Sequence, residues 1–212
     1  MNRKVFIAIF AFCAIAAAFV FAHGAFAQEQ NAAEKYKIGD KGPGGGIVFY
    51  YSEEGFPVQD SDDATPVICH YLECSPEELG EMALCPCRWK RGWCYVNTTD
   101  GVGAGKLNTA LITSYKHQEL LRPSNCAAEV CSQYSTNMTK KGEWYLPSKT
   151  ELDLIYKNLV KMGIINNKVR HWSSSKDHYE SVWSQDFSNG EQYDDGLSNE
   201  GIGFVVRAVR AF

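Results

Sequence analysis

Cysteine is the residue type in this sequence with the most chemistry to offer. Seven of the eight cysteines follow residue 27: Cys69, Cys74, Cys85, Cys87, Cys94, Cys126 and Cys131. In an oxidising compartment such residues form disulfides, so they predict a stapled scaffold whose pairing stays open. Seven is an odd number, so at least one thiol is free or bonds to a second chain in a disulfide-linked dimer. Zinc is the alternative for residues 69–94, but the cluster lacks two C-x-x-C pairs.

The segment "HWSSSKDH" combines the side chains of a hydrolase triad. Three serines stand between His171 and His178, with Asp177 beside them. However, no G-x-S-x-G elbow surrounds a serine, and neighbouring strand residues point to opposite faces. We therefore predict no catalytic residue and no enzyme activity. The segment is interpreted as a strand with Trp172 in the core and serines that satisfy backbone groups.

Two acidic stretches, 60–63 and 186–195, could hold calcium. The second, "DFSNGEQYDDGL", has its glycine at the fifth place and so does not match a calcium-binding EF-hand loop. We interpret both stretches as solvated loop tips and predict no cofactor, with calcium or zinc as the alternatives.

Aromatic side chains in loop-rich stretches are typical of sugar-binding and protein-binding faces. Two segments have this character, "CRWKRGWCY" and "NGEQYDD". They supply the predicted ligand-binding residues, which are Trp89, Trp93, Tyr193, Asp194 and Asp195.

The first 27 residues have the layout of a secretory signal peptide. A short basic start precedes an apolar run, and small residues then surround a cleavage site before Gln28. We expect a polar tail over 28–35 and one domain over 36–212. The protein is therefore predicted to be exported, to the periplasm, the cell surface or the medium, with no membrane association beyond the export step.

The charge balance argues against nucleic acid as a partner. The whole chain has 21 basic and 25 acidic residues, and the signal segment removes Arg3 and Lys4, which leaves 19 − 25 = −6. Binding to a phosphate backbone needs clustered Lys and Arg, which this composition does not provide.

The glycine run in "KIGDKGPGGGIVFYY", residues 37–51, resembles a phosphate-binding loop at first sight. A phosphate loop places its glycines between a strand and a helix, with a G-K-[ST] sequence. Here the glycines precede a strand and no such sequence follows. We therefore predict a tight entry turn or the close approach of another strand.

Residue periodicity predicts an α+β fold. Strands are expected at 46–51, 67–72, 89–96, 171–174, 181–187 and 203–212, and short helices at 107–114 and 126–134. The clearest element is a helix after Pro147. Ser148 and Glu151 form an S-x-x-E capping box, an apolar stripe follows, and Gly163 stands where the helix should end. The stripe consists of Leu152, Ile155, Leu159 and Met162.

Several motifs occur in an order that resembles one family: "YKIGDKGPGGGIVFY", "YLECSPEELG", "GVGAGKLNTALI", "WYLPSKTELDLIY", "HWSSS…SVWSQDFSNG" and "VRAVRAF". They resemble the C-terminal domain of a collagen-like adhesin, a bacterial exported domain family of unknown function. That family is similar to the C-type-lectin-like fold, in its formylglycine-generating-enzyme branch. The resemblance implies small twisted antiparallel sheets, two to three flanking helices, long loops, and pairing of strands 46–51 and 204–210.

The activities known for that fold do not carry over. Calcium-dependent sugar binding needs E-P-N or Q-P-D together with W-N-D, and the oxidase branch needs a C-terminal cysteine pair; neither is present. We expect an adhesin-like, non-catalytic binding module for a glycan or a surface protein. The alternatives are an envelope structural or assembly protein, a secreted hydrolase and a metal-binding protein.

Overall fold

The computed structural model describes residues 35–82, 88–89, 92–93, 96–118, 126–166, 168–177, 181–195 and 204–212, without the side chains of 81–82, 88–89, 92–93, 115–118 and 195. The predicted signal peptide lies outside these residues. Contacts divide the chain into Met1–Lys37 and Ile38–Phe212, and every element named below belongs to the second unit.

The described fold is α+β, as the sequence predicts. Its strands are β1 (Ile47–Val58), β2 (Val67–Cys74), β3 (Glu81–Met82), β4 (Arg88–Trp89), β5 (Gly92–Trp93), β6 (Arg170–Lys176), β7 (Val182–Asp186), β8 (Gln192–Asp195), β9 (Phe204–Val205) and β10 (Val209–Ala211). Its helices are α2 (Ala104–Gln118), α3 (Ala127–Gln133), α4 (Lys149–Ile155) and the π-helical η2 (Tyr156–Val160). Within the described residues, no helix is long and apolar enough to cross a bilayer.

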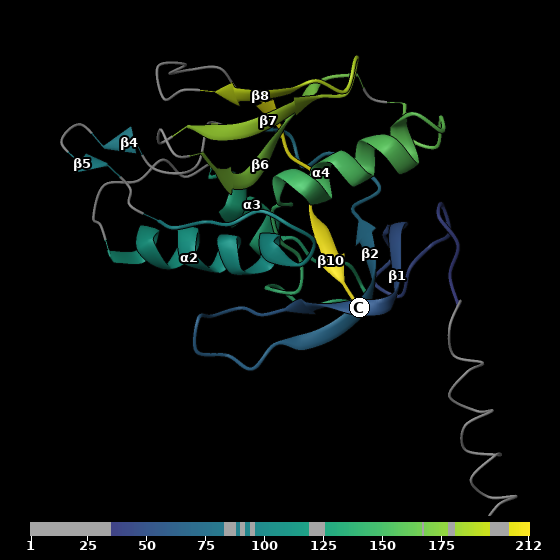
Figure 1. The fold of residues 1–212 in the computed structure, drawn as a ribbon, viewed down its shortest axis with the longest axis horizontal. Coiled ribbons are helices and arrows are strands. Elements are labelled where there is room, and N and C mark those ends of the chain that lie inside the picture. Colours follow the sequence, from purple (N-terminus) through teal and green to yellow (C-terminus); the bar gives the residue numbers. More distant parts are fainter. Residues whose placement is uncertain are drawn as a thin grey trace, which may run out of the picture. The chain divides into compact units, whose positions relative to one another are not determined.

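The strands form sheets that are mostly antiparallel. One sheet has the order β1-β2-β10, a second has β3-β9-β6-β7-β8, and β4 pairs with β5 alone. Figure 1 shows β2 between β1 and β10, with α4 close by. The expected pairing of the first and last strands therefore needs correction: both lie in one sheet, but β2 separates them.

Two apolar clusters hold these layers together. The first joins α2, α3 and β6 through Trp144 and Trp172, which are both almost fully buried. The second joins β1, β2 and α4 through side chains such as Phe49, Leu72 and Leu152. The predicted core position of Trp172 is confirmed.

The capping-box helix is confirmed at its start. The Ser148 side chain accepts from the Glu151 backbone N–H, and the Glu151 side chain accepts from the Ser148 N–H. Gly163 has a φ of +74°, the left-handed conformation expected after a helix end. Met162, however, is 64% exposed and not part of the stripe. The π-helical turn over η2 inserts an extra residue, so positions after it rotate away from the buried face.

The single terminal strand predicted over 203–212 is wrong. Its first part is β9, in the five-stranded sheet, and its last part is β10, in the three-stranded sheet. Between them Val206, Arg207 and Ala208 are consecutive and all buried. The chain crosses there from one sheet to the other, so its burial does not alternate as it does in a half-buried strand.

Candidate functional site

The three serines of "HWSSS" all donate to backbone carbonyls. The Ser173 hydroxyl donates to the Trp183 carbonyl over 2.7 Å, that of Ser174 to the Pro147 carbonyl over 3.1 Å, and that of Ser175 to the Thr99 carbonyl over 3.0 Å. These bonds attach β6 to β7 and to two loops. The predicted structural role of the serines is confirmed, and none of them donates its proton to a histidine.

His171 is a core residue. Its ring is fully buried and stacks on Phe187 with 4.0 Å between the ring centroids. Nδ1 lies 3.0 Å from the Val169 carbonyl, and Nε2 lies 3.5 Å from the Glu78 carboxylate. Burial lowers the pKa of His171, since a cation is poorly solvated there. The imidazole therefore supports the fold and does not face a reactive hydroxyl.

The structure places two predicted ligand-binding residues side by side on β8. Tyr193 pairs across the sheet with Ser184, and Asp194 with Trp183, so their side chains lie on opposite faces. The Tyr193 hydroxyl donates to Glu191 over 2.5 Å, and the Arg170 guanidinium lies 3.9 Å from its ring centroid. Tyr193 is thus occupied by contacts within the chain.

The other three predicted ligand-binding residues are described through their backbone alone. Trp89 and Trp93 lie in the β4–β5 ribbon, a sheet separate from β8, and Asp195 pairs with Val182. For the metal alternatives, the described side chains include no group of three or more His, Cys, Asp or Glu that could hold an ion.

Three of the seven disulfide candidates need correction. Cys69, Cys74 and Cys131 are free thiols, and all are buried. Cys69 and Cys74 lie five positions apart in one strand, about 16 Å at about 3.3 Å per residue, so they cannot bond to each other. Cys126 is disulfide-bonded. Cys85, Cys87 and Cys94 lie outside the described residues.

The free thiols of Cys74 and Cys131 are expected to resist labelling in the folded protein, because both side chains are completely buried. Burial raises the pKa of both, that of Cys74 to about 12, which reduces its thiolate fraction about a thousandfold. A chromogenic thiol reagent should therefore react with these two only after unfolding in guanidinium. A Ser188→Cys variant, which places a thiol on an exposed turn, should react at once. Rapid labelling of native Cys74 would contradict the burial described here.

The glycine loop before β1 surrounds an anion that the chain itself supplies. The N–H groups of Gly44 and Gly46 each donate over 2.9 Å to the carboxylate of Glu73, which is completely buried. A Cβ on Gly44 would lie 2.4 Å from Glu73 Oε1, and one on Gly46 would lie 2.5 Å from the Cys74 carbonyl. The glycines are therefore required by the close approach of β2, as predicted.

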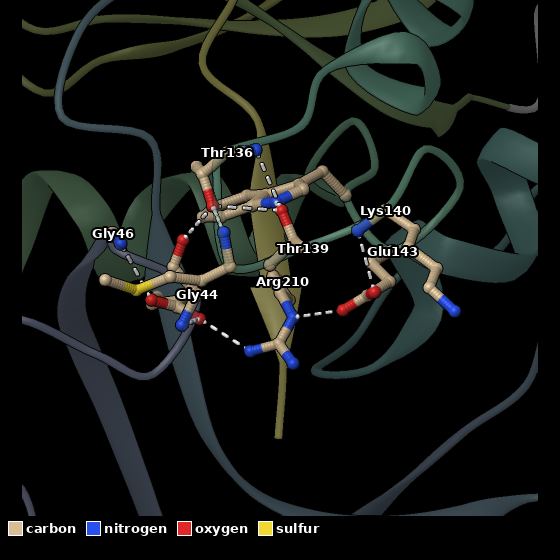
Figure 2. Close-up of polar contacts among 10 residues, drawn as sticks. Gly44, Gly46, Thr136, Thr139, Lys140, Glu143 and Arg210 are labelled. Carbon is tan, nitrogen blue, oxygen red and sulfur yellow. Dashed lines mark hydrogen bonds and ion pairs between the residues drawn. The ribbon is translucent and has the colours of Figure 1, made fainter.

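Arg210 neutralises this buried carboxylate. Its Nη1 lies 2.7 Å from Glu73 Oε1, and its Nε lies 3.0 Å from Glu143 Oε2. Figure 2 shows Arg210 between the glycine loop and Glu143, whose other oxygen accepts the Lys140 N–H. That backbone bond lowers the pKa of Glu143, and Arg210 adds to the effect. Glu143 is thus held as an anion.

Two threonines attach the glycine loop to the segment before Glu143. The Thr136 hydroxyl donates to the Gly44 carbonyl over 2.7 Å, and the Trp144 indole N–H donates to Thr139 Oγ1 over 2.8 Å. The Thr136 N–H also donates to Thr139 Oγ1 (Figure 2). This network fixes the position of Glu143, which also lines a neighbouring cavity.

That cavity has a volume of about 210 Å³ and lies between the β1–β2 hairpin, α2 and the end of β10. Its lining is Val58, Gln59, Asp60, Ala64, Thr65, Val67, Cys69, Lys106, Glu143 and Ala211. Binding pockets for drug-sized ligands measure about 300–1,000 Å³. This cavity therefore suits one small group, such as a single sugar unit or amino acid.

Two charges in the cavity are unpaired with any described residue. Lys106 on α2 is half-buried and Asp60 is exposed, and neither forms an ion pair or a side-chain hydrogen bond. The Lys106 ammonium acts on the pKa of both Cys69 and Glu143, lowering each in part. It therefore lies among the lining residues rather than out in solvent.

Sequence reasoning did not find Lys106, Asp60 or Glu143 as a group. Asp60 lies in a loop, Lys106 in a helix and Glu143 in a turn. These elements are far apart in the chain, and no regular spacing in the sequence connects the three residues. The sequence does contain one sign of the network beside the cavity: Glu73 is a lone acid within the apolar run of β2. A buried charge of this kind requires a partner.

The chain was compared with protein-family models, with curated proteins and with solved structures, and none of the three comparisons finds a match.

Proposed function

We propose that the protein is an exported, non-catalytic binding module, adhesin-like in its action on a glycan or protein ligand. Its fold is proposed to be C-type-lectin-like. That fold assignment is supported by the shared sheet of the first and last described strands and by α2 and α4, which pack against β1 and β6. The place of action is the periplasm, the cell surface or the medium, as the predicted signal peptide implies.

The observation that carries this proposal is the contrast between the cavity and the serine–histidine segment. Ser173–Ser175 and His171 are committed to backbone and core contacts. Lys106 and Asp60, by contrast, line an open cavity without partners among the described residues. Charged groups that line a cavity and remain unpaired are suited to hold a ligand. The Cys69 thiol lies beside them, but burial raises its pKa and so reduces the nucleophilic thiolate form.

An envelope assembly role through an interchain disulfide receives no support from the three free thiols that the structure describes. Cys69, Cys74 and Cys131 are all buried, so none of them can reach a second chain without local unfolding. A secreted hydrolase would need a hydroxyl aimed at a base, whereas Ser173–Ser175 each donate to a backbone carbonyl. The second contact of the Ser175 hydroxyl, 3.4 Å from Asp100, does not involve a histidine.

A ligand screen with a product analysis tests the function. We expect the mature chain to bind at least one ligand, from a glycan array or from a set of immobilised surface proteins, saturably and reversibly. Mass spectrometry should recover that ligand unchanged after prolonged incubation. Conversion of the ligand by the wild type, lost in a Ser175→Ala or His171→Gln variant, would overturn the non-catalytic assignment.

A further inference from the structure

The charges in the cavity narrow the chemistry of the group that it would bind. The Lys106 ammonium is half-buried, so a ligand anion there would replace water rather than compete with an existing ion pair. Glu143, the nearby acid, already accepts from Arg210 and from the Lys140 N–H. The positive charge that is still available in the cavity is therefore that of Lys106, which suits an anionic group such as a carboxylate.

Asp60 supplies the opposite charge at the hairpin side of the same cavity. No ion pair joins it to Lys106, although both residues line the cavity. A ligand with a positive group beside its carboxylate could satisfy both side chains at once. A purely anionic ligand would be repelled by the Asp60 carboxylate.

Part of the remaining wall of the cavity is aliphatic, beside the polar side chains of Gln59 and Thr65. Val58, Val67 and Ala211 contribute side chains without hydrogen-bonding groups, and Val67 is 64% exposed although it lines the cavity. A short apolar group of a ligand would cover part of this surface. The volume of about 210 Å³ limits that group to a few carbon atoms.

Together these features lead us to propose that the cavity binds a free α-amino acid with an aliphatic side chain. Its carboxylate lies at Lys106, its ammonium at Asp60, and its side chain against Val58 and Val67. This inference rests on the proposed binding function in one respect, that the cavity is a ligand site. It differs in the ligand: the group bound in the cavity is a zwitterion and not a sugar unit or a peptide side chain.

Isothermal titration of the mature chain with L-leucine, leucinamide and N-acetyl-leucine tests this proposal without any mutation. We expect leucine to bind and each blocked derivative to bind at least about tenfold more weakly. Leucinamide lacks the carboxylate, and N-acetyl-leucine lacks the ammonium, so each loses one charged contact. Equal binding of leucine and leucinamide would overturn the role of Lys106. Equal binding of leucine and N-acetyl-leucine would overturn that of Asp60.

Variants then locate the site. Lys106→Gln and Asp60→Asn are each expected to weaken leucine binding about tenfold. The matched controls Lys161→Gln and Asp62→Asn remove the same charges outside the lining and should leave it unchanged. Circular dichroism confirms that each variant is folded. Unchanged binding in both cavity variants would overturn the assignment to this cavity.

Glycans and a short extended peptide, titrated in parallel, separate this inference from the proposed function. If a glycan or the peptide binds and no amino acid does, the zwitterion inference is overturned and the binding-module function stands. If nothing binds, both are overturned.

Discussion

Replacement of Arg210 by methionine is expected to reduce the free energy of unfolding by about 3–5 kcal/mol. The variant keeps an apolar stem but leaves the Glu73 carboxylate without its counter-ion. That carboxylate is completely buried, with two backbone N–H groups as its remaining partners. Removing one member of a buried ion pair costs more than the pair itself contributes, because the other charge stays buried. Denaturant unfolding followed by circular dichroism measures the change.

The matched control is Lys157→Met, which removes one partner of an exposed pair. Lys157 lies 2.6 Å from Asp153 but is 60% exposed, so its loss is expected to cost less than about 1 kcal/mol. A comparable small loss for Arg210→Met would mean that Glu73 is not buried as described. The arrangement around the glycine loop would then be wrong.

Replacement of Glu151 by glutamine is expected to destabilise the protein by about 1–3 kcal/mol. The two oxygens of Glu151 accept N–H groups from opposite sides, one from Gly103 over 2.9 Å and one from Ser148 over 2.8 Å. Glutamine has one acceptor oxygen, so one of these N–H groups would face an amide NH₂. Thermal unfolding at a fixed pH measures the loss. Glu191→Gln, on an exposed turn, is the control and should change little.

The same residue predicts a pH dependence. Burial raises the pKa of Glu151 from 4.5 to about 7, although the Ser148 and Gly103 N–H groups oppose the shift. Between these values the folded protein binds more protons at this carboxyl than the unfolded chain does. Its contribution to stability is therefore complete below pH 4.5 and is lost as the pH rises through about 7. The slope is at most about 1.4 kcal/mol per pH unit.

In Glu151→Gln the free energy of unfolding is expected to lose this decrease with pH, because glutamine does not titrate. The difference in the free energy of unfolding between wild type and variant therefore narrows as the pH rises from 4.5 to 7. Unfolding curves across that range measure it. A gap that stays constant, or one that widens toward pH 7, would show that Glu151 does not titrate in this range.

The parts of the fold that follow local rules could be predicted. The capping box of Ser148 and Glu151, the glycine at the end of that helix and the strand around Trp172 each depend on neighbouring residues. The structural role of the serines followed from strand geometry. In each case the residues that decide the structure lie within a few positions of one another.

The parts that failed depend on contacts between distant segments. The π-helical turn that exposes Met162 and the crossing at Arg207 are not visible in a periodic pattern. The close approach of another strand to the glycine loop was predicted, but the anion that the loop binds, Glu73, was not, because it comes from 27 residues beyond Gly46. The cavity combines Lys106 and Asp60 from different elements, so the sequence directed attention to aromatic loops instead.

The most direct test of the central claim, that ligands bind in the cavity between the β1–β2 hairpin and α2, is an amide NMR titration of the mature chain with a mixture of monosaccharides and amino acids. We predict that shifts concentrate at the lining residues, above all Val58, Lys106 and Ala211, while Tyr193 and Asp194 on β8 remain unchanged. Shifts that appear at β8 instead, or none anywhere, would contradict the claim.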